Sequence, residues 1–276
     1  PLRLLAGPPR GPHPVGSGEP ARDVGLTVRE IAALLRERDP DDEWLDALAA
    51  DGRAGVRQIA ARFQRRRERE QRERRRLEGL FAWERARRRE GFARIAGVDE
   101  AGVGPLAGPV VAAAVILSGE EPLAGLNDSK TLSPEDRARL YAALVARGAR
   151  IGIGLADVGE IDRLNILQAT RLAWRRAVMQ LLPGPDCVLI DGRYRVDLPL
   201  AQMPIVDGDA QCASIAAAAI VAKVTRDRVM RDLDRRFPEF GFAGHKGYAT
   251  PAHLAAIRRF GFSPVHRRSY LPMRVF

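Results

Sequence analysis

The fold is decided by a stretch near the middle of the chain, IAGVDEAGVGPLAGPVVAAAVIL (residues 95–117). It contains two apolar runs, 95–99 and 109–117, whose length and composition are typical of buried strands. Between the runs lie Asp99, Glu100 and a segment rich in glycine. We therefore expect two strands joined by a glycine-containing loop, with two acidic side chains where the first strand ends.

The pattern continues outward from this stretch with further strands and helices. Strands are predicted at 150–155, 187–191 and 204–206, and helices at 134–147, 164–182 and 213–236. Strands that come first and then alternate with helices predict an α/β domain, in which a mixed five-stranded sheet has helices on its faces. We assign residues 93–276 to this domain, with helical structure toward its C-terminus.

The residues before this domain differ from it in composition. Residues 1–22 are rich in Pro, Gly and Arg without a period, and we expect a disordered leader. Residues 23–92 are expected to form a basic helical extension, which begins with a Thr27–Glu30 capping box. Residues 62–90 contain thirteen arginines and six glutamates, a net charge of +7. Two interpretations stay open: a helix with solvated, paired charges, or an arm that lies along nucleic-acid phosphates.

The overall composition limits the class of protein. The chain has 276 residues, of which 46% are hydrophobic, enough for a sizeable core. Its longest apolar run, 105–117, is shorter than the ~18 residues that span a membrane, and its first residues lack the order of a secretory signal. Two cysteines, Cys187 and Cys212, are too few for a disulfide framework and predict buried thiols. We expect a cytoplasmic protein with no membrane partner.

The chain is strongly basic. Its 45 basic residues exceed the 35 acidic ones by ten, and only three of the basic residues are lysines, Lys130, Lys223 and Lys246. A positive field of this size favours a polyanionic partner. Lysines that persist among so many arginines indicate positions where a compact, flexible ammonium group is needed.

Four acidic residues stand where predicted strands end or turn: Asp99, Glu100, Asp191 and Asp209. Carboxylates in one pocket repel each other unless a cation neutralises them, and oxygen ligands select Mg²⁺ or Mn²⁺. Two such ions about 3.5–4 Å apart can activate a water and stabilise the leaving oxygen of a phosphodiester. Two objections stay open. An Asp-Gly pair after a strand is often only a turn, and neighbours on a regular strand point to opposite faces.

Other kinds of site find little support in the sequence. The segment 102–104 is followed by a predicted strand and not by the helix that a dinucleotide-binding loop requires. The sequence contains no Gly-Lys-Ser or Gly-Lys-Thr phosphate loop, and its four histidines lack the spacing of zinc ligands. Neither Ser129 nor Ser214 has an evident histidine and acid partner for nucleophilic catalysis.

Several segments together resemble the bacterial ribonuclease HII family. Residues 97–109 (GVDEAGVGPLAGP) resemble the opening motif of that family. Further matching segments follow in the same order across 93–270: LNDSK (126–130), IDRLNIL (161–167), LIDG (189–192), GD (208–209), IVAKVTRD (220–227), HKGY (245–248) and HRRSY (266–270). Residues 24–92 resemble a helical extension that some bacterial members carry.

The resemblance implies a ribonuclease H-like fold and a two-metal endonuclease. Such an enzyme would hydrolyse the RNA strand of RNA–DNA hybrids and cut 5′ of single ribonucleotides embedded in duplex DNA, leaving 5′-phosphate and 3′-hydroxyl ends. Asp99, Glu100, Asp191 and Asp209 would be its catalytic and metal-binding carboxylates, with Mg²⁺ or Mn²⁺ as cofactor. Its partners would be RNA–DNA hybrids and ribonucleotide-containing duplex DNA. We expect a monomer.

The resemblance also assigns nucleic-acid binding to eight residues: Gly102, Val103, Gly104, Asn127, Ser129, Lys130, Lys246 and Tyr248. It implies that the 102–104 loop reads the 2′-hydroxyl through its backbone and that Tyr248 packs on the sugar at the junction. Lys130 and Lys246 would contact phosphates. Ordinary surface packing stays open for Tyr248, and a pair with Asp227 one helical turn away stays open for Lys223.

Three positions depart from the family pattern. Val103 stands where the loop usually has Arg, Asp207 replaces a usual Lys, and Ala219 replaces a usual Ser. Loss of the Arg removes a contact of about 1–3 kcal/mol, while the loop amides remain. Asp207 adds negative charge beside the predicted metals. A second function therefore stays open, a protein that binds RNA–DNA hybrids with attenuated catalysis.

Overall fold

The computed structural model describes residues 26–37, 40–121 and 123–270. The predicted leader, 1–22, lies outside the described residues. The chain divides into two compact units, and the boundary along the sequence lies between Arg72 and Glu73. The boundary expected between residues 92 and 93 stays a prediction.

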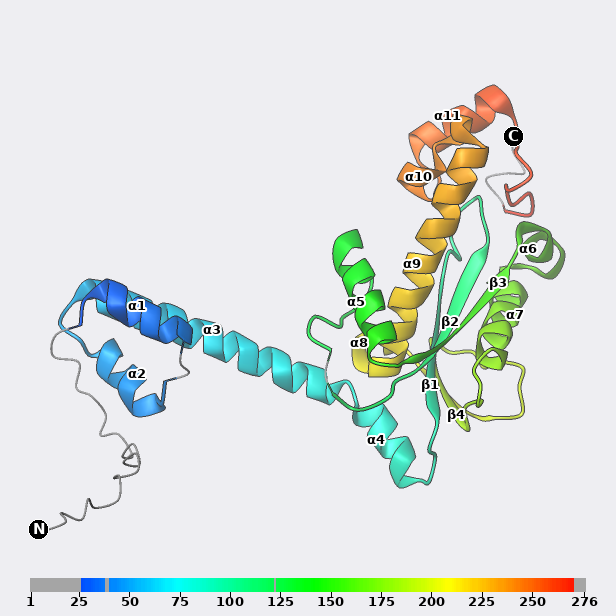
Figure 1. The fold of residues 1–276 in the computed structure, drawn as a ribbon. Helices are drawn as coiled ribbons and strands as arrows, with labels where there is room; N and C mark the ends of the chain where they lie inside the picture. Colours follow the sequence, from blue (N-terminus) through cyan, green and yellow to red (C-terminus); the bar gives the residue numbers. More distant parts are fainter. Residues whose placement is uncertain (1–25, 38–39, 122, 271–276) are drawn as a thin grey trace, which may run out of the picture. The chain divides into compact units, whose positions relative to one another are not determined.

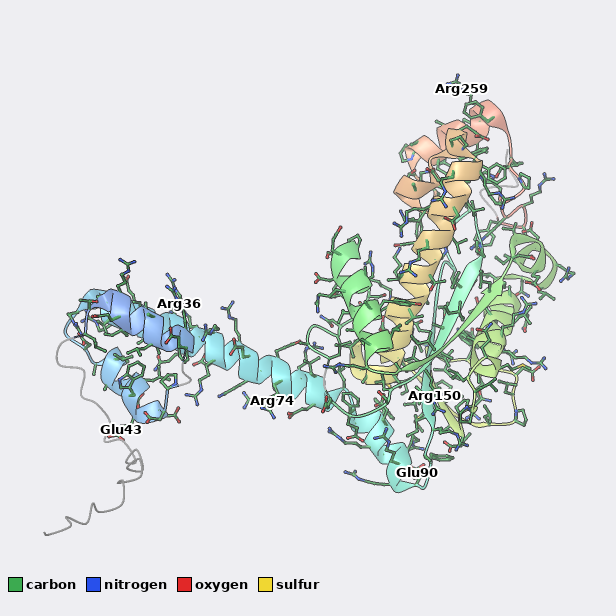
Figure 2. All side chains as sticks on the ribbon, in the orientation of Figure 1. Arg36, Glu43, Arg74, Glu90, Arg150 and Arg259 are labelled. Atoms are coloured by element: carbon green, nitrogen blue, oxygen red, sulfur yellow. The ribbon has the colours of Figure 1, made fainter. Side chains whose placement is uncertain are left out.

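The first unit contains two short helices, α1 (Val28–Glu37) and α2 (Asp42–Ala49), and the beginning of a long one, α3 (Ala54–Gly79). The predicted capping box at α1 is present. The amide of Glu30 donates to Thr27 Oγ1 at 3.3 Å, and the amide of Thr27 donates to Glu30 Oε2 at 2.7 Å. Apolar side chains of the three helices form a small core. Farther along α3 the side chains are mostly exposed, as around Arg74 in Figure 2.

The second unit contains a mixed five-stranded sheet with the order β3-β2-β1-β4-β5. Its strands are β1 (Ile95–Ala101), β2 (Val110–Ile116), β3 (Arg150–Ala156), β4 (Cys187–Asp191) and β5 (Ala201–Ile205). The β1–β2 and β2–β3 pairs are antiparallel, whereas β1–β4 and β4–β5 are parallel. The prediction of an α/β fold with a mixed five-stranded sheet is confirmed.

Helices cover both faces of the sheet (Figure 1). Helix α9 (Ala213–Arg236) packs on one face against β1 and β2, and α5 (Pro134–Ala146) packs against α9. Helix α7 (Ile166–Met179) packs on the other face against β3 and β2. The alternation along β2 shows the two layers. Ala113 and Val115 belong to the core under α9, whereas Ala112 and Ala114 belong to the core under α7.

Two glycines let these helices lie very close to the sheet. A Cβ atom at Gly97 on β1 would lie 2.1 Å from the backbone carbon of Ser214 on α9. A Cβ atom at Gly154 on β3 would lie 2.0 Å from the carbonyl oxygen of Ala173 on α7. Any side chain at these positions would push a helix away from its strand.

Two predicted elements differ from the structure. The helix predicted over 164–182 begins later, as α7, because the chain turns at Asn165, which has a left-handed φ of 73° and caps α7 by accepting from the amide of Gln168 at 3.1 Å. A short helix that was not predicted, α6 (Val158–Leu164), precedes this turn. The strand predicted over 204–206 lies slightly earlier, as β5. It is an edge strand, where a residue without an amide hydrogen such as Pro204 is tolerated.

The end of α3 and helix α4 (Ala82–Arg89) pack within the second unit. Leu77, Leu80 and Phe81 join the core under α9. The buried carboxylate of Glu84 accepts a hydrogen bond from the amide of Ser214 at 2.8 Å and so caps the start of α9. Residues 73–92 therefore stabilise the sheet domain, although their composition resembles that of the basic helix before them.

The predicted C-terminal helical region is present as η1 (Pro238–Phe240), α10 (Phe242–His245) and α11 (Pro251–Phe260). Both cysteines are buried and unpaired, as predicted. None of the helices in the described part of the chain combines the length and the apolar character that crossing a membrane requires.

Candidate active site

The four predicted carboxylates meet at one edge of the sheet. Asp99 and Glu100 lie near the end of β1, Asp191 ends β4, and Asp209 lies in the short helix α8 (Gly208–Gln211) after β5. The strands β1 and β4 are parallel neighbours, so their carboxyl ends lie side by side. Residues far apart in the sequence are thereby brought to the place where open α/β sheets bind ligands.

Three of these side chains, those of Asp99, Glu100 and Asp191, face a pocket of about 250 Å³. Its lining includes Asp99, Glu100, Asp191, the 102–104 loop, Ser129, Lys130, Tyr248 and three residues of α9, Ala219, Lys223 and Arg226. Asp209 is connected to the pocket by Lys130, whose Nζ donates to Asp209 Oδ2 at 3.4 Å. The pocket thus combines acidic groups with an ammonium group and an exposed aromatic ring.

Asp99 and Glu100 share this pocket although they are neighbours on one strand. Gly97 packs on α9, and Asp99, two residues further on, lies on the same face of β1. Glu100 lies on the opposite face, where its Oε2 accepts from Trp174 Nε1 of α7 at 2.9 Å. Because β1 ends here, both side chains reach the open sheet edge. The two side chains therefore point to opposite faces of β1, as strand alternation requires, but they line the same pocket.

Each carboxylate is held by one hydrogen bond. Asp99 Oδ1 accepts from the amide of Glu100 at 2.7 Å, and Asp191 Oδ1 accepts from the amide of Gly208 at 2.8 Å. Trp174 and Lys130 hold Glu100 and Asp209 in the same way. In all four groups the second carboxylate oxygen has no donor among the described residues.

The electrostatics of the pocket disfavour ionised carboxylates. Burial, together with the charges of Glu100 and Asp191, raises the pKa of Asp99 well above its usual value. Burial raises the pKa of Glu100 to about 7, although the hydrogen bond from Trp174 opposes this shift. Burial also raises the pKa of Asp209, against the charge of Lys130. A divalent cation would remove this penalty, because it favours the ionised form of each carboxylate that it contacts.

The donor set fits a hard divalent cation. Carboxylate oxygens without thiol or imidazole neighbours are the ligands of Mg²⁺ and Mn²⁺. Asp99, Glu100, Asp191 and Asp209 would hold such ions through the oxygens that lack a donor. Within the described chain, no three acidic, histidine or cysteine side chains already surround a common point. We therefore expect binding of the metal to draw these oxygens together.

The structure brings together most, but not all, of the residues predicted to bind nucleic acid. The 102–104 loop, Ser129, Lys130 and Tyr248 line the pocket. Asn127 does not line it, and its Oδ1 accepts from the amide of Asp128. Lys246 does not line it either, and its Nζ donates to the carbonyl oxygen of Ala243. Their contacts with nucleic acid stay predictions.

The positions that depart from the family pattern lie around the same pocket. Val103 and Ala219 line it, and Val103 is partly exposed. Asp207 is exposed and has a left-handed φ of 53°, directly before α8. The ion pair considered for Lys223 exists, with its Nζ 2.7 Å from Asp227 Oδ1, and Lys223 also lines the pocket.

Several residues of the site were not predicted from the sequence. Trp174 orients Glu100, and Arg226 and Arg267 contact the backbone of the 102–109 segment. Trp174 lies in an ordinary amphipathic helix, so no local pattern marks it. The two arginines are not distinctive in the sequence, because it contains 40 other arginines.

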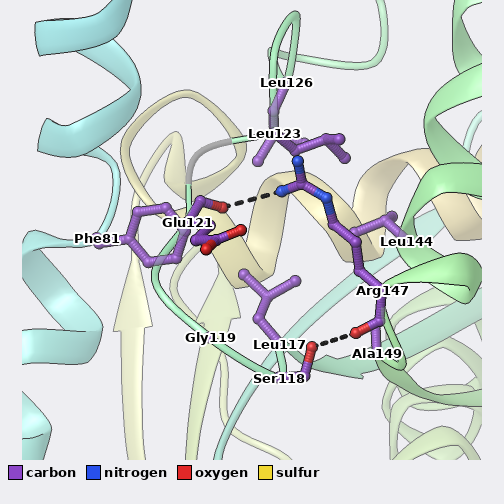
Figure 3. A pocket seen from close by; sticks show the side chains of 10 residues that line it. All are labelled: Phe81, Leu117, Ser118, Gly119, Glu121, Leu123, Leu126, Leu144, Arg147 and Ala149. Atoms are coloured by element: carbon purple, nitrogen blue, oxygen red, sulfur yellow. Dashed lines mark hydrogen bonds between the residues drawn. The ribbon is translucent and has the colours of Figure 1, made fainter. Parts of the chain in front are cut away.

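A second pocket of about 280 Å³ lies apart from the carboxylates (Figure 3). Leucine side chains, including Leu117, Leu123 and Leu144, and the ring of Phe81 line it. Arg147 crosses it and donates to the carbonyl oxygen of Glu121 at 3.1 Å. The pocket lacks a group of acidic side chains comparable with that at the sheet edge, so the candidate active site is the pocket at the carboxylates.

The fold and the site together define the class of protein. The ribonuclease H2 from Pyrococcus horikoshii OT3 is similar in structure, with a TM-score of 0.56 and 27% identity, over 66% of this chain and 96% of that chain. Bst-RNase HIII in complex with Mn²⁺ has a TM-score of 0.51 and 18% identity, over 66% of this chain and 68% of that chain, and supports the fold alone. The class is that of the ribonuclease H-like nucleases.

The sequence comparisons specify the family. The family model described as Ribonuclease HII matches residues 96–272, and that described as Ribonuclease HII N-terminal domain matches residues 27–88. The Ribonuclease HII of Geobacillus kaustophilus (strain HTA426) is 50% identical over 248 residues, which cover 90% of this chain and 95% of the relative. The chain belongs to the ribonuclease HII family and is an endonuclease of the ribonuclease H type.

Proposed function

We propose that this endonuclease hydrolyses the RNA strand of RNA–DNA hybrids and cuts 5′ of single ribonucleotides embedded in duplex DNA, leaving 5′-phosphate and 3′-hydroxyl ends. The observation that carries the proposal is the pocket itself. Acidic residues from the ends of β1 and β4 line it beside the 102–104 loop and Tyr248. Residues suited to hydrolysis and residues that can contact a sugar thus line the same pocket.

The carboxylates are proposed to bind two Mg²⁺ or Mn²⁺ ions. When bound, these ions lower the pKa of a water and stabilise charge on the leaving oxygen. Asp99, Glu100, Asp191 and Asp209 would orient the ions, and Trp174 would keep Glu100 turned toward the pocket. Lys130, the most exposed group that contacts this acidic set, would bind a phosphate oxygen.

Selection of RNA over DNA is proposed to come from the space between the loop and the tyrosine. Gly104 has no side chain, and a Cβ atom there would lie 3.8 Å from Tyr248 Cε1. The ring of Tyr248 is about half exposed, so one face is open to a sugar. The backbone amides of the loop could donate to a 2′-hydroxyl, the group that distinguishes RNA from DNA.

The proposal is tested by incubating the full chain with a duplex that carries one ribonucleotide and with a continuous RNA–DNA hybrid, each with Mg²⁺ and with Mn²⁺. We expect metal-dependent cuts on the 5′ side of the single ribonucleotide. Tight binding of both duplexes without cleavage in either metal would instead favour the attenuated binding protein, the alternative suggested by Val103 and Asp207.

Replacement of Trp174 by Phe is expected to shift the pH dependence of cleavage toward higher pH. The indole donates to Glu100 and lowers the pKa of that carboxyl, so its loss raises this pKa further. Protons and metal ions compete for the same oxygens, so the variant needs a higher pH for half-maximal rate. The measurement is the cleavage rate against pH at limiting Mg²⁺.

A suitable control for this variant is Trp83→Phe, because Trp83 packs against a core that does not include the pocket residues. Its pH midpoint should equal that of the unaltered chain. If Trp174→Phe has that same midpoint, Trp174 does not tune Glu100.

We further propose that α3 contacts phosphates through one face. Arg62, Arg65 and Arg69 are spaced three and four residues apart, so they share a face of the helix. None of these three has an acidic partner among the described residues. Arg66 and Arg67, in contrast, lie 3.6 Å from Glu70 and 2.6 Å from Asp42. The helix therefore carries arginines with acidic partners and also a stripe of three arginines, Arg62, Arg65 and Arg69, without such partners.

Replacing the three stripe residues by Gln is expected to weaken binding to an RNA–DNA hybrid and to flatten its salt dependence. Each lost phosphate contact reduces the slope of log K against log salt by roughly 0.9, so the slope should fall by roughly 2–3. The matched control replaces Arg66, Arg67 and Arg74, which have acidic partners, by Gln. Equal slopes for the two triple variants would show that the stripe has no special role.

Replacement of Val103 by Arg is expected to increase the preference for a single embedded ribonucleotide over a continuous hybrid. Val103 lies on the pocket wall and is partly exposed, so a longer side chain can extend over the substrate. A charge-assisted contact there is worth about 1–3 kcal/mol, which corresponds to a change in the ratio of roughly 5- to 150-fold. The ratio of kcat/KM for the two substrates measures this effect, and an unchanged ratio would contradict our account of the loop.

A further inference from the structure

Two arginines of the second unit are buried without an acidic partner. Arg226 of α9 is 1% exposed and Arg267, in the segment after α11, is 0% exposed, and neither forms an ion pair with a described residue. A buried guanidinium is costly unless its N–H groups are satisfied. Burial, together with the nearby charge of Arg267, lowers the pKa of Arg226 to about 10, so it stays protonated at neutral pH. The fold keeps two like charges where most proteins place apolar side chains.

Both guanidinium groups donate to backbone carbonyls of the loop that follows β1. Arg267 donates to the carbonyl oxygens of Gly102 at 2.6 Å, Val103 at 2.9 Å and Gly108 at 2.9 Å. Arg226 donates to those of Ala107 at 3.2 Å and Pro109 at 3.1 Å. The hydroxyl of Tyr270 adds a bridge, because it accepts from Arg267 Nη1 at 2.8 Å and donates to the carbonyl of Val103.

These bonds decide the direction in which the loop amides point. In a trans peptide the N–H and C=O bonds point to opposite sides. The carbonyls of Gly102 and Val103 point inward to Arg267, so the N–H groups of Val103 and Gly104 point away from it. Neither N–H donates to a described residue, and both residues line the pocket. The buried arginine thus presents two free donors to the site.

Arg226 also connects the loop to the turn that carries Tyr248. Arg226 donates to the carbonyl of Lys246 at 3.1 Å as well as to the loop. The amide of Leu106 donates to the carbonyl of Gly247 at 2.8 Å. Gly102 has a φ of 95°, and a Cβ atom there would lie 1.9 Å from Arg226 Nε, so the loop rests directly on this side chain. Arg267 holds the loop, and Arg226 holds both the loop and this turn, so the two arginines form one buried frame.

We propose that Arg226 and Arg267 are positioning residues for ribose recognition, which hold the amides of Val103 and Gly104 at a set distance from the ring of Tyr248. This inference rests on the proposed function. The frame acts from behind the loop and contacts the backbone only, so the amides keep their direction whatever side chain stands at position 103. The loop can therefore carry Val where relatives of this family usually carry Arg without losing its donors.

The test compares Arg267→Lys with Arg268→Lys, its exposed neighbour in sequence. A lysine at position 267 keeps the charge but lacks the fork of donors that holds several carbonyls at once. Cleavage of a single-ribonucleotide duplex depends on one correctly placed ribose, whereas a continuous hybrid offers many registers. We expect Arg267→Lys to lower kcat on the single-ribonucleotide duplex at least tenfold relative to the hybrid, with KM for both duplexes unchanged. Arg268→Lys should leave this ratio unchanged.

The kcat ratio separates positioning from folding, because a partly unfolded sample loses the same fraction of activity on both substrates. An unchanged ratio in folded Arg267→Lys would overturn the proposal. If that variant fails to fold, Tyr270→Phe decides the matter, since it removes only the hydroxyl bridge; we expect a smaller fall in the same ratio, and no fall would overturn the proposal. Absence of cleavage by the unaltered chain would instead contradict the proposed function.

Discussion

Replacement of Asp99 or Asp191 by Asn is expected to abolish cleavage of ribonucleotide-containing duplexes, with a fall in kcat of at least ~1000-fold, or about 4 kcal/mol in the activation barrier. Asn has nearly the size and shape of Asp but no charge, so it weakens the binding of a divalent cation without altering the packing. Both residues line the same pocket from adjacent parallel strands. The measurement is single-turnover cleavage with Mg²⁺ and with Mn²⁺.

The same substitution at Asp99 is expected to leave thermal stability unchanged or to raise it. Asp99 is buried beside Glu100 and Asp191, and both charges raise its pKa, so ionisation at this position opposes folding in the absence of metal. Higher stability with lost activity is a signature of a site optimised for a ligand. Asp197→Asn, at an exposed acid in the segment between β4 and β5, is the control and should retain full activity. Cleavage at the unaltered rate by Asp99→Asn would remove the proposed role of the carboxylates.

Replacement of Gly97 by Ala is expected to destabilise the second unit by about 3 kcal/mol or more. The new Cβ atom would lie 2.1 Å from the backbone carbon and 2.4 Å from the carbonyl oxygen of Ser214. Both are main-chain atoms of α9, so the clash cannot be relieved by turning a side chain, and the helix must move away from β1. A loss of this size corresponds to a fall in Tm of roughly 6–12 °C.

Thermal unfolding followed by circular dichroism measures this effect. Gly119→Ala is the matched control, because no heavy atom lies within 4 Å of a Cβ atom at that position. We also expect reduced cleavage by folded Gly97→Ala, since β1 carries Asp99 and α9 begins four residues after Asp209. A Tm for Gly97→Ala equal to that of Gly119→Ala would show that α9 can shift at little cost.

The positions of the strands and of the four acidic residues could be predicted because each is marked locally. An apolar run followed by an acidic residue and glycine indicates the end of a buried strand, whatever the rest of the chain does. The convergence of Asp99 and Asp191 could not be derived in this way, because it depends on β1 and β4 being neighbours in the sheet. The family resemblance supplied that convergence, and the structure provides its geometry.

No local sequence pattern marks the residues that support the site. Trp174 and Glu100 are 74 positions apart, and Arg267 and Gly102 are 165 positions apart. Asn165 is another position whose structural role no local pattern indicates. Its left-handed backbone and capping side chain begin α7 two residues after the predicted start at 164, and the short helix α6 before it was not predicted.

The α/β class, the basic character of the chain and the acidic residues at the strand ends follow from the residues alone, because burial and charge leave a periodic or compositional pattern in each segment. Three features become evident only in the folded chain: the strand order, the opposite faces from which Asp99 and Glu100 reach one pocket, and the buried arginines behind the loop. These features depend on hydrogen bonds and close packing between distant segments, and such contacts need complementary positions in space without requiring any pattern along the chain.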